Sequence, residues 1–506
     1  MQEPNYPESY WVESAKRIES DNSIESQKIE TVIVGAGITG ITLAYLLVQE
    51  GVKVALIDAD RIIHGTTGHT TAKITAQHGL IYDKMINQSG IEKASLYYKA
   101  NNEALQFIAD TIQKHEISCD FSRQDAYVYT NMDEYFDKIM LEHRAYEKLG
   151  ITGDVVKELP ISIDAKLGIM MKNQAQFHPV KYLNKLVEAF VSRGGILLEN
   201  TPVADIENDE HPKVILKNGG QIEANKLVLA THYPFYDWPG LYFARLHAER
   251  SYVVAAKSTK PYAGGMYINA ESPTRSIRYT PLNEGENLLL IGGETHKTGQ
   301  GESTLSHYEK LVEFTKNNFG IEEISYRWSA QDLVTLDDIP YVGHITADEP
   351  NIYVATGYAK WGMTNGTAAA RVIRDLILDK QNDFVDLYTP SRFDANPSIK
   401  NVIVQNADVA KQLIKGKLEA PDKTIEDIAN SEGAAVMING ERAGCYKDEE
   451  GQIYLVDTTC THIGCEVKWN SGDRSWDCPC HGSRFSYKGE VMEGPATEPL
   501  RRIDLD

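Results

Sequence analysis

Four potential metal ligands lie close together near the end of this 506-residue sequence. Cys460 and His462 form a C-x-H motif, Cys478 and His481 form a C-x-x-H motif, and fifteen residues separate the two. Thiolates and neutral imidazoles both bind transition metals, so two such pairs can hold one centre. Five of the six cysteines fall within the last 62 residues, which also favours a metal centre over scattered reduced thiols.

The spacing distinguishes two kinds of metal site. Structural zinc sites normally leave two to four residues between paired ligands, whereas C-x-H leaves only one. Two thiolates on one iron and two imidazoles on the other are the ligands of a Rieske [2Fe–2S] cluster, whose imidazoles raise its reduction potential. The sequence therefore predicts a Rieske cluster on Cys460, His462, Cys478 and His481, with structural zinc as the alternative.

A second motif predicts dinucleotide binding. Gly35, Gly37 and Gly40 form G-x-G-x-x-G between the strand-like run TVIV and a proline-free helical stretch, and Asp58 ends the next expected strand. Glycines at this spacing allow a tight turn, close approach of a pyrophosphate and close helix–strand packing. Asp58 would bind a ribose hydroxyl and repel a 2′-phosphate. A second motif of this kind does not occur, which disfavours a two-dinucleotide reductase, but this unit alone leaves FAD and NAD open.

Three further segments resemble the D-amino-acid-oxidase and glycine-oxidase family of flavoproteins. They are GTTGHTTAKITAQHG (65–79), Val203 with the strand KLVLATH (226–232), and the pair TLDDIPYVGH (335–344) and NIYVATGYAKWGMTNGTAAA (351–370). The resemblance covers about residues 28–392 and implies FAD. Some members bind flavin covalently through cysteine, but Cys119 lies in no matching segment, so we expect non-covalent FAD. The implied FAD-binding residues are Gly35, Gly37, Ile38, Thr39, Gly40, Asp58, Thr70, Thr71, Val203, Gly357, Gly362, Met363 and Thr364.

The same resemblance implies a catalytic pocket over the flavin for an amine or amino-acid substrate. His69 and Lys73 resemble a basic pair beside the flavin in sarcosine-oxidase-like members. Arg250, Tyr252 and Arg278 lie on expected strands of the substrate domain, where an arginine could clamp a substrate carboxylate through two hydrogen bonds. For each of these residues the alternative is a surface salt bridge or a hydroxyl at the edge of the core.

The segment CTHIGC…CPCHGSRFSYKGEVMEGPATEPL resembles the high-potential Rieske proteins of respiratory and photosynthetic complexes. The resemblance implies a disulfide between Cys465 and Cys480, a hydrogen bond from Ser483 to a bridging sulfide, and a shielding loop at 494–496. Those proteins carry a tyrosine where this chain has Phe485. Without that O–H···S donor, we expect a midpoint potential below the top of the Rieske range of about −150 to +300 mV.

The elements that must position these residues predict a fold. We expect an α/β FAD-binding domain, Rossmann-like and of glutathione-reductase type, with an interleaved α+β substrate domain, followed by a small all-β Rieske domain. The FAD-dependent body spans 28–393, residues 394–425 connect the domains across the surface with a helix possible at 401–415, and 426–506 form the Rieske domain. Within the body, FAD binding falls mainly in 28–80, 195–235 and 335–380, and the substrate part mainly in 81–194 and 236–334.

Composition and charge limit the partners. The chain has 51 Lys and Arg against 72 Asp and Glu, and a net charge of −21 argues against nucleic acid and anionic membranes. It has no uncharged 18-residue stretch for a membrane span and no recognisable export signal, so we expect a cytoplasmic protein. Residues 426–506 carry 16 carboxylates and 8 basic side chains, so we expect a basic electron-transfer partner or a docked oligomer.

These features favour a flavin–Rieske oxidoreductase. FAD would oxidise the C–N bond of an amine or amino acid, and the electrons would pass singly to the cluster and leave through exposed imidazoles of His462 and His481. One alternative reverses the flow, from an external donor through the cluster to FAD. Another is a non-enzymatic redox carrier or sensor without a competent pocket.

Overall fold

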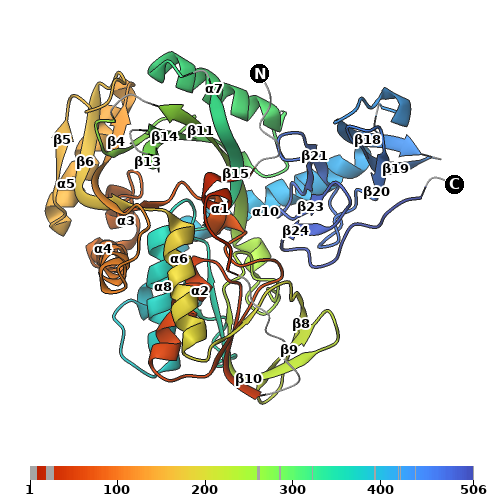
Figure 1. The fold of residues 1–506 in the computed structure, drawn as a ribbon, viewed down its shortest axis with the longest axis horizontal. Helices are drawn as coiled ribbons and strands as arrows, with labels where there is room; N and C mark the ends of the chain where they lie inside the picture. Colours follow the sequence, from red (N-terminus) through yellow and green to blue (C-terminus); the bar gives the residue numbers. More distant parts are fainter. Residues whose placement is uncertain are drawn as a thin grey trace.

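The structure, a computed structural model, consists of a large body and a small β domain at one end (Figure 1). It describes residues 8–18, 28–258, 262–283, 286–301, 303–321, 323–392, 395–419, 421, 423–438 and 440–504. The expected domain boundary at 393/394 therefore lies outside the described residues.

The first sheet of the body is the Rossmann-like part. Its central strands run parallel in the order β17–β10–β1–β2–β7, while β16 and β9 add antiparallel neighbours at β17 and β10. The apolar run TVIV lies in β1, whose last residues are buried, as expected for a parallel strand covered on both faces. The strands are β1 (Lys28–Val34), β2 (Val54–Ile57), β7 (Ile196–Leu198), β8 (Val203–Asn208), β9 (Pro212–Leu216), β10 (Gln221–Leu229), β16 (Tyr341–His344) and β17 (Ile352–Thr356).

The second sheet of the body is mostly antiparallel and, apart from β3, is formed almost entirely by the segments that the sequence assigns to the substrate part. Its order is β15–β11–β14–β13–β12–β4–β6–β3, with β5 also paired to β6. The strands are β3 (Lys73–Ile74), β4 (Ser122–Thr130), β5 (Gly153–Val156), β6 (Leu167–Gln176), β11 (Leu246–Ser258), β12 (Met266–Asn269), β13 (Arg275–Asn283), β14 (Glu286–Lys297) and β15 (Ile324–Thr335). The long edge strand β15 extends toward the small domain (Figure 1).

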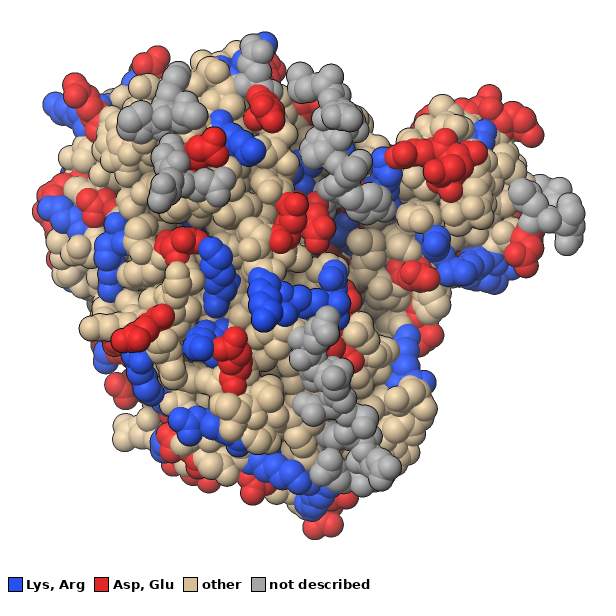
Figure 2. Space-filling model, viewed as in Figure 1, with Lys and Arg blue, Asp and Glu red and all other residues tan. Residues whose placement is uncertain are grey.

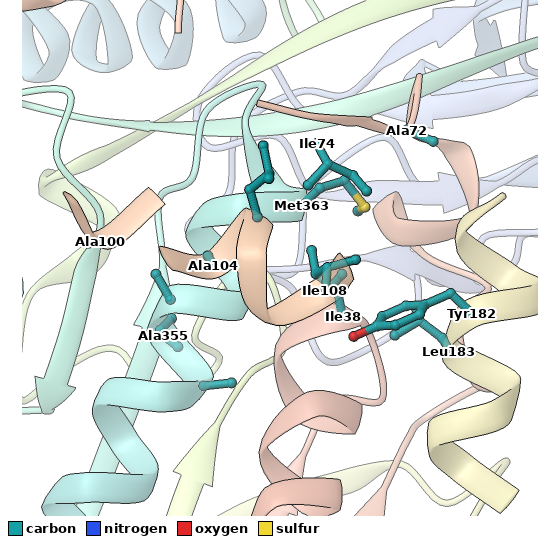
Figure 3. Close-up of a cluster of buried hydrophobic side chains, with 14 of the residues drawn as sticks. Ile38, Ala72, Ile74, Ala100, Ala104, Ile108, Tyr182, Leu183, Ala355 and Met363 are labelled. Carbon is teal, nitrogen blue, oxygen red and sulfur yellow. The ribbon is translucent and has the colours of Figure 1, made fainter. Parts of the chain in front are cut away.

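Helices pack against both sheets and enclose the main hydrophobic core. Figure 3 shows Ile38 of α2, Ile108 of α4 and Tyr182 of α6 close together, with Met363 of α8 above them. Small residues such as Ala104 let α4 lie close to its neighbours. The helices are α1 (Tyr10–Glu13), α2 (Ile38–Gln49), α3 (Tyr82–Ser89), α4 (Ile91–Lys114), α5 (Phe136–Leu149), α6 (Pro179–Ser192), α7 (Thr304–Phe319), α8 (Gly362–Ile377), α9 (Val385–Tyr388) and α10 (Ala395–Leu418), with 3₁₀ turns η1 (Thr66–His69), η2 (Asp133–Tyr135), η3 (Tyr242–Ala244) and η4 (Ile425–Asp427).

The small domain is all-β, as expected. Two antiparallel sheets, β18–β19–β20 and β21–β22–β23–β24, each cover a small core of their own. Figure 2 shows the domain as a separate lobe and acidic and basic side chains interspersed over this face of the body. The strands are β18 (Gly433–Ile438), β19 (Glu441–Lys447), β20 (Ile453–Val456), β21 (Lys468–Asn470), β22 (Ser475–Asp477), β23 (Arg484–Ser486) and β24 (Val491–Glu493).

The connecting segment is mostly one long helix, α10, which extends beyond the helix expected at 401–415 and keeps most of its described side chains at least partly exposed. On the body side, Asn406 donates to the carbonyl of Ala244 over 3.2 Å, and Lys297 donates to Asp408 over 2.9 Å. On the other side, Leu413 packs against the core of the small domain. The helix is therefore stabilised by contacts with both lobes, which local sequence periodicity does not reveal. Of the helices in the described part of the chain, none combines the length and apolar character needed to cross a bilayer.

Candidate redox sites

The four predicted cluster ligands lie on two loops that a disulfide joins. One loop, 460–465, follows β20, and the other, 478–483, connects β22 to β23. Cys465 and Cys480 form a disulfide with their Cα atoms 6.5 Å apart, which confirms the pairing implied by the resemblance. The sulfur atoms of Cys465, Cys478 and Cys480 lie within 4.8 Å of one another, but the disulfide occupies two of them, so Cys478 is the free thiol of this group.

The pKa values of Cys460 and of both imidazoles are shifted toward the forms that bind iron, whereas the contact with Cys460 and burial raise the pKa of Cys478. Cys460 interacts with Cys478, and this contact, together with N–H groups of the same loop and the Ser483 hydroxyl, lowers the pKa of Cys460 to about 7. Burial lowers the pKa of His462 to about 4 and that of His481 to about 3, so both rings are neutral near pH 7.

The imidazole nitrogens also lack other partners. Their rings lie with centroids 5.1 Å apart, and within the described structure both ring nitrogens of His481 and Nδ1 of His462 are buried without a hydrogen bond. Buried polar atoms are normally paired, so unpaired imidazole nitrogens on the two loops that also carry the free thiols Cys460 and Cys478 are what a metal cluster would complete. This donor set of two thiols and two neutral imidazoles fits a Rieske cluster.

The imidazoles are not exposed, so the prediction that they form the electron exit is wrong. His481 is 3% exposed and the His462 side chain 14%. Phe243 of the body covers them, with its ring centroid 6.4 Å from that of His462 and 5.9 Å from that of His481. Asp237 lies 3.9 Å from Nε2 of His462. The body therefore caps the imidazole side of the site, and neither Phe243 nor Asp237 belongs to a motif that could have signalled this.

The glycine motif forms a cradle that only glycine permits. Gly35 has φ of +105°, and a Cβ there would lie 2.3 Å from the carbonyl oxygen of Ala230. A Cβ on Gly40 would lie 1.9 Å from the carbonyl oxygen of Gly35. Helix α2 then begins without a side-chain cap, so its first N–H groups suit a pyrophosphate. Ile38 is the exception, because its N–H donates to Thr67 Oγ1 over 3.1 Å.

Asp58 lies at the same end of the sheet. Its carboxylate accepts hydrogen bonds from the N–H groups of Ala36, at 2.7 Å, and Asp60, at 3.0 Å. Burial outweighs these bonds and raises the pKa of Asp58 to about 6. Val203 begins β8, two residues after Thr201, whose N–H donates to the Asp58 carbonyl over 2.8 Å. Asp58 and Val203, the two residues expected to contact the adenosine half of the cofactor, therefore lie on adjoining segments.

The remaining predicted cofactor contacts lie where α8 begins. Gly357 has φ of +78° and follows β17, and Gly362 starts α8, where a Cβ would meet nothing within 4 Å. Thr39 joins this region to the glycine motif through a 2.9 Å hydrogen bond with the Tyr358 hydroxyl. Thr364 donates to the carbonyl of Thr75 over 3.0 Å. The open space at Gly362 and the uncapped helix start suit a flat, polar cofactor such as FAD.

Lys73 is a candidate base at this site. It is half-buried on β3, and its ammonium group forms no hydrogen bond or ion pair with other residues in the described ranges. Burial, helped by the charge of Arg278, lowers the pKa of Lys73 to about 7. His69 ends η1, where its Nδ1 bonds the Gly65 carbonyl at 2.9 Å, and burial lowers its pKa as well. The structure therefore places the predicted basic pair on consecutive elements, with His69 at the end of η1 and Lys73 at the start of β3.

Arg278 holds the turn that carries Lys73. Its guanidinium is buried and donates to the carbonyls of Thr71, at 2.9 Å, and Ala72, at 2.6 Å. It also lies over the Trp11 ring, 5.2 Å from the centroid. These carbonyls accept from Nη1, and the Tyr279 carbonyl accepts from Nε over 3.2 Å. Of the three nitrogens, only Nη2 has no partner among the described residues, so the arrangement does not fit a two-nitrogen clamp for a substrate carboxylate. Thr70 lies in the same turn, where its hydroxyl accepts from the Ala72 N–H at 3.0 Å.

Arg250 and Tyr252 on β11 also do not fit the roles predicted for them. Arg250 is fully buried and donates to Asp473 and Glu493 of the small domain, each at 3.1 Å. Tyr252 is fully buried as well, and its hydroxyl bonds Nε2 of His296 at 2.9 Å. The sequence places both residues on strands of the substrate domain, but it does not show that carboxylates of the small domain bind Arg250.

Gln331 on β15 is a connecting residue that sequence reasoning missed. Its side-chain N–H donates to the carbonyl of Gly482 in the cluster loop over 3.0 Å. Its backbone carbonyl accepts from Thr66 Oγ1, in η1, over 3.2 Å. One residue thus joins the loop of His481 to the turn that begins the flavin-side segment, and no local motif marks it.

Comparison with known proteins agrees with this geometry. Residues 30–376 match the model of the family described as FAD dependent oxidoreductase. The chain belongs to that family. Residues 420–504 match the Rieske [2Fe-2S] domain. The enzyme is therefore an oxidoreductase with FAD and a Rieske cluster as cofactors, and the expected fold class is confirmed.

Relatives cover either the whole chain or its body. One relative is YhfW of Bacillus subtilis (strain 168), whose name describes it as a Rieske 2Fe-2S iron-sulfur protein. It is 50% identical over 500 residues, which cover 99% of this chain and 98% of the relative. The γ-glutamylputrescine oxidoreductase of Escherichia coli (strain K12) is 22% identical over 73% of this chain and 88% of its own length. The crystal structure of glycine oxidase from Geobacillus kaustophilus superposes with a TM-score of 0.62 at 16% identity, over 73% of this chain and all of that one.

Proposed function

We propose that this oxidoreductase oxidises the C–N bond of an amine or amino acid at FAD and passes the electrons through its Rieske cluster to an acceptor. Membership of the FAD dependent oxidoreductase family supports the reaction class, and a relative that acts on γ-glutamylputrescine supports an amine substrate. The observation that carries electron transfer between the two cofactors of one chain is the burial of His481, at 3% exposure, against the body that holds the flavin site.

The burial of the imidazoles against the body favours electron transfer between flavin and cluster within one chain. Phe243 and the segment around Asp237 cover the imidazole side, so an external partner would exchange electrons with the cluster from another side. Gln331 instead connects the cluster loop to η1 by two hydrogen bonds, through Gly482 and Thr66. Transfer within one docked chain would therefore require no swinging of the small domain.

Particular residues would hold each cofactor. Cys460, His462, Cys478 and His481 would bind the two irons, and the glycine cradle with the uncapped starts of α2 and α8 would hold FAD. FAD would supply the two-electron oxidation of the substrate, and the cluster would supply one-electron transfer. Asp58 would contact the ribose, since it lies beside the cradle and accepts from Ala36.

Lys73 would hold the proton that the substrate loses. Amines are mostly protonated near neutral pH, and the protonated form cannot give up a hydride from the neighbouring carbon readily. A lysine with a pKa of about 7 and no anionic partner can accept that proton. Arg278 would act as a positioning residue, because it holds the Thr71–Ala72 turn and its charge keeps the Lys73 amine partly neutral.

Anaerobic rapid mixing with a panel of glycine, sarcosine, D-alanine and putrescine tests this function. The expected result with at least one compound is bleaching of the flavin band, followed by a slower loss of oxidised-cluster absorbance at a rate independent of protein concentration. The matched control is Cys478→Ser, which should bleach its flavin without the second phase. Absence of bleaching with every amine or amino acid tried would favour a carrier or sensor. Reduction of the cluster before the flavin by a one-electron donor alone, with substrate-independent turnover, would favour the reverse flow.

A further inference from the structure

The N-terminal segment 8–18, called the strap below, packs inside the body although it lies before the family match at 30–376. Its residues Ser9, Tyr10 and Trp11 are at most 4% exposed, and the two aromatic side chains belong to the main hydrophobic core. Figure 1 shows α1, which contains both of them, in the middle of the body beside β15. The strap is therefore part of the body's core, although the matched family range does not include it.

The strap binds the turn between η1 and β3. The Ser9 hydroxyl donates to the carbonyl of Gly68, and Nε1 of Trp11 donates to the carbonyl of Thr70 over 2.7 Å. Thr70 is an expected FAD contact, and Lys73, the candidate base, begins the strand that follows. The strap thus holds the turn that serves both the cofactor and the substrate.

Every backbone carbonyl in the 68–72 turn accepts a hydrogen bond from a side chain. Besides the two bonds from the strap, Nε1 of Trp328 donates to the carbonyl of His69 over 2.8 Å. Nη1 of Arg278 donates to the last two carbonyls of the turn, at 2.9 and 2.6 Å. The four donor residues are each at most 1% exposed. Because no strand or helix pairs these carbonyls, the side chains fix the orientation of each peptide group in the turn.

The turn needs this support because of Ala72. This residue has φ of +57°, in the left-handed region that an alanine keeps only where its surroundings impose it. Its N–H donates to the Thr70 hydroxyl over 3.0 Å, and its carbonyl accepts from Arg278. Arg278 in turn lies over the Trp11 ring, 5.2 Å from the centroid. The strap therefore supports Ala72 along two routes, through Thr70 and through Arg278.

We propose that Ser9 and Trp11 are positioning residues that hold the 68–72 turn in a single conformation. The held turn presents Thr70 to FAD and Lys73 to the substrate. The family fold supplies the turn, and the strap supplies its rigidity. The part that concerns Lys73 rests on the proposed function, whereas the part that concerns FAD needs no substrate.

Trp11→Phe tests the proposal in the FAD-loaded full chain. The variant keeps a ring beside Arg278 but removes the N–H that binds the Thr70 carbonyl. We expect faster amide hydrogen–deuterium exchange in peptides that cover residues 66–74. The dissociation constant of FAD should rise about tenfold, the change expected when one buried hydrogen bond is left unmade. Flavin circular dichroism at saturating FAD should also change, because the cofactor then meets a less ordered turn.

Trp476→Phe is the matched control. Trp476 is also fully buried, but it lies on β22 of the small domain, and its Nε1 has no partner in the described part of the chain. The control shrinks a buried ring equally, so all three measurements should stay native. Native values in Trp11→Phe, or equal changes in both variants, would overturn the proposal. If Trp11→Phe does not fold, Ser9→Ala takes its place with the same expected directions, because it removes only a hydroxyl group.

The kinetics of flavin bleaching test the part that concerns Lys73. With an amine that bleaches the native flavin, Trp11→Phe at saturating FAD should lower the limiting rate of bleaching. A raised half-saturating substrate concentration with a native limiting rate would contradict the positioning of Lys73. If no amine bleaches the native flavin, the proposed function fails, whereas exchange at 66–74 and FAD affinity still decide whether the strap holds the turn.

Discussion

Arg250 of the flavin body donates a hydrogen bond to Asp473 of the Rieske domain across 3.1 Å. Both side chains are nearly inaccessible, at 0% and 5% exposure. Arg484 of the small domain also contacts Asp473, at 3.0 Å, and both arginines contact Glu493. The two arginines thus share their carboxylates in one buried network that fixes the Rieske domain against the body.

Replacing Arg250 by methionine should undock the Rieske domain. The substitution keeps a long apolar stem but leaves buried carboxylates without one of their two cations, a loss that typically costs about 3–5 kcal/mol. We expect a lower free energy of unfolding in urea, followed by the visible circular dichroism of the cluster, and a slower flavin-to-cluster phase. Arg501→Met is the control, because Arg501 is 67% exposed in its pair with Asp457 and should change stability by less than about 1 kcal/mol. Equal stability of the two variants would contradict a structural role for the network.

The same network predicts acid sensitivity through Glu493. Burial opposes ionisation, but Arg484 and Arg250 outweigh it and lower the pKa of Glu493 to about 2. Because the unfolded glutamate has a pKa of about 4.3, the stabilisation is complete above that pH and is lost as pH falls toward 2. The stability difference between the native chain and Glu493→Gln should therefore shrink from pH 5.5 to pH 3, as measured by denaturant unfolding. A difference that stays constant over this range would show that the charge of Glu493 does not matter.

Gly482 should control the contact between the cluster loop and the body. A Cβ there would lie 2.4 Å from Cβ of Ala248 and 3.0 Å from the Gln331 side-chain oxygen, so Gly482→Ala should displace the loop and slow flavin-to-cluster transfer. Gly464→Ala is a matched control in the other cluster loop, because both glycines have φ of +81° but Gly464 has nothing within 4 Å of a Cβ. Rapid-mixing rates should fall in Gly482→Ala, partly recover with Ala248→Gly, and stay near native in Gly464→Ala. Equal slowing in both alanine variants would assign the effect to backbone strain alone.

The parts of this protein that could be predicted from sequence are those that local spacing determines. The C-x-H and C-x-x-H pairs and the glycine motif each lie within a few residues, so their chemistry can be recognised without knowledge of the fold. The covering of His481 by Phe243 joins residues more than 200 positions apart, and no pattern around either one encodes it. The same holds for Arg250, whose strand was predicted but whose partners Asp473 and Glu493 lie in another domain.

Lys73 provides a prediction about catalysis that follows from its lowered pKa. Burial and the charge of Arg278 bring that pKa to about 7, so the amine is protonated below pH 7 and becomes a competent base above it. The second-order rate of flavin bleaching by an amine substrate should therefore rise through pH 7 and level off once the lysine is neutral. Lys73→Met should lower this rate by roughly 10²–10⁴-fold, the usual contribution of a general base, and remove the inflection near pH 7. Arg278→Gln removes a charge that favours the neutral lysine, so its inflection should move to higher pH. A native pH profile in Lys73→Met would exclude Lys73 as the base. If the inflection disappeared in Lys73→Met but did not move in Arg278→Gln, burial rather than the charge of Arg278 would set the pKa of the lysine.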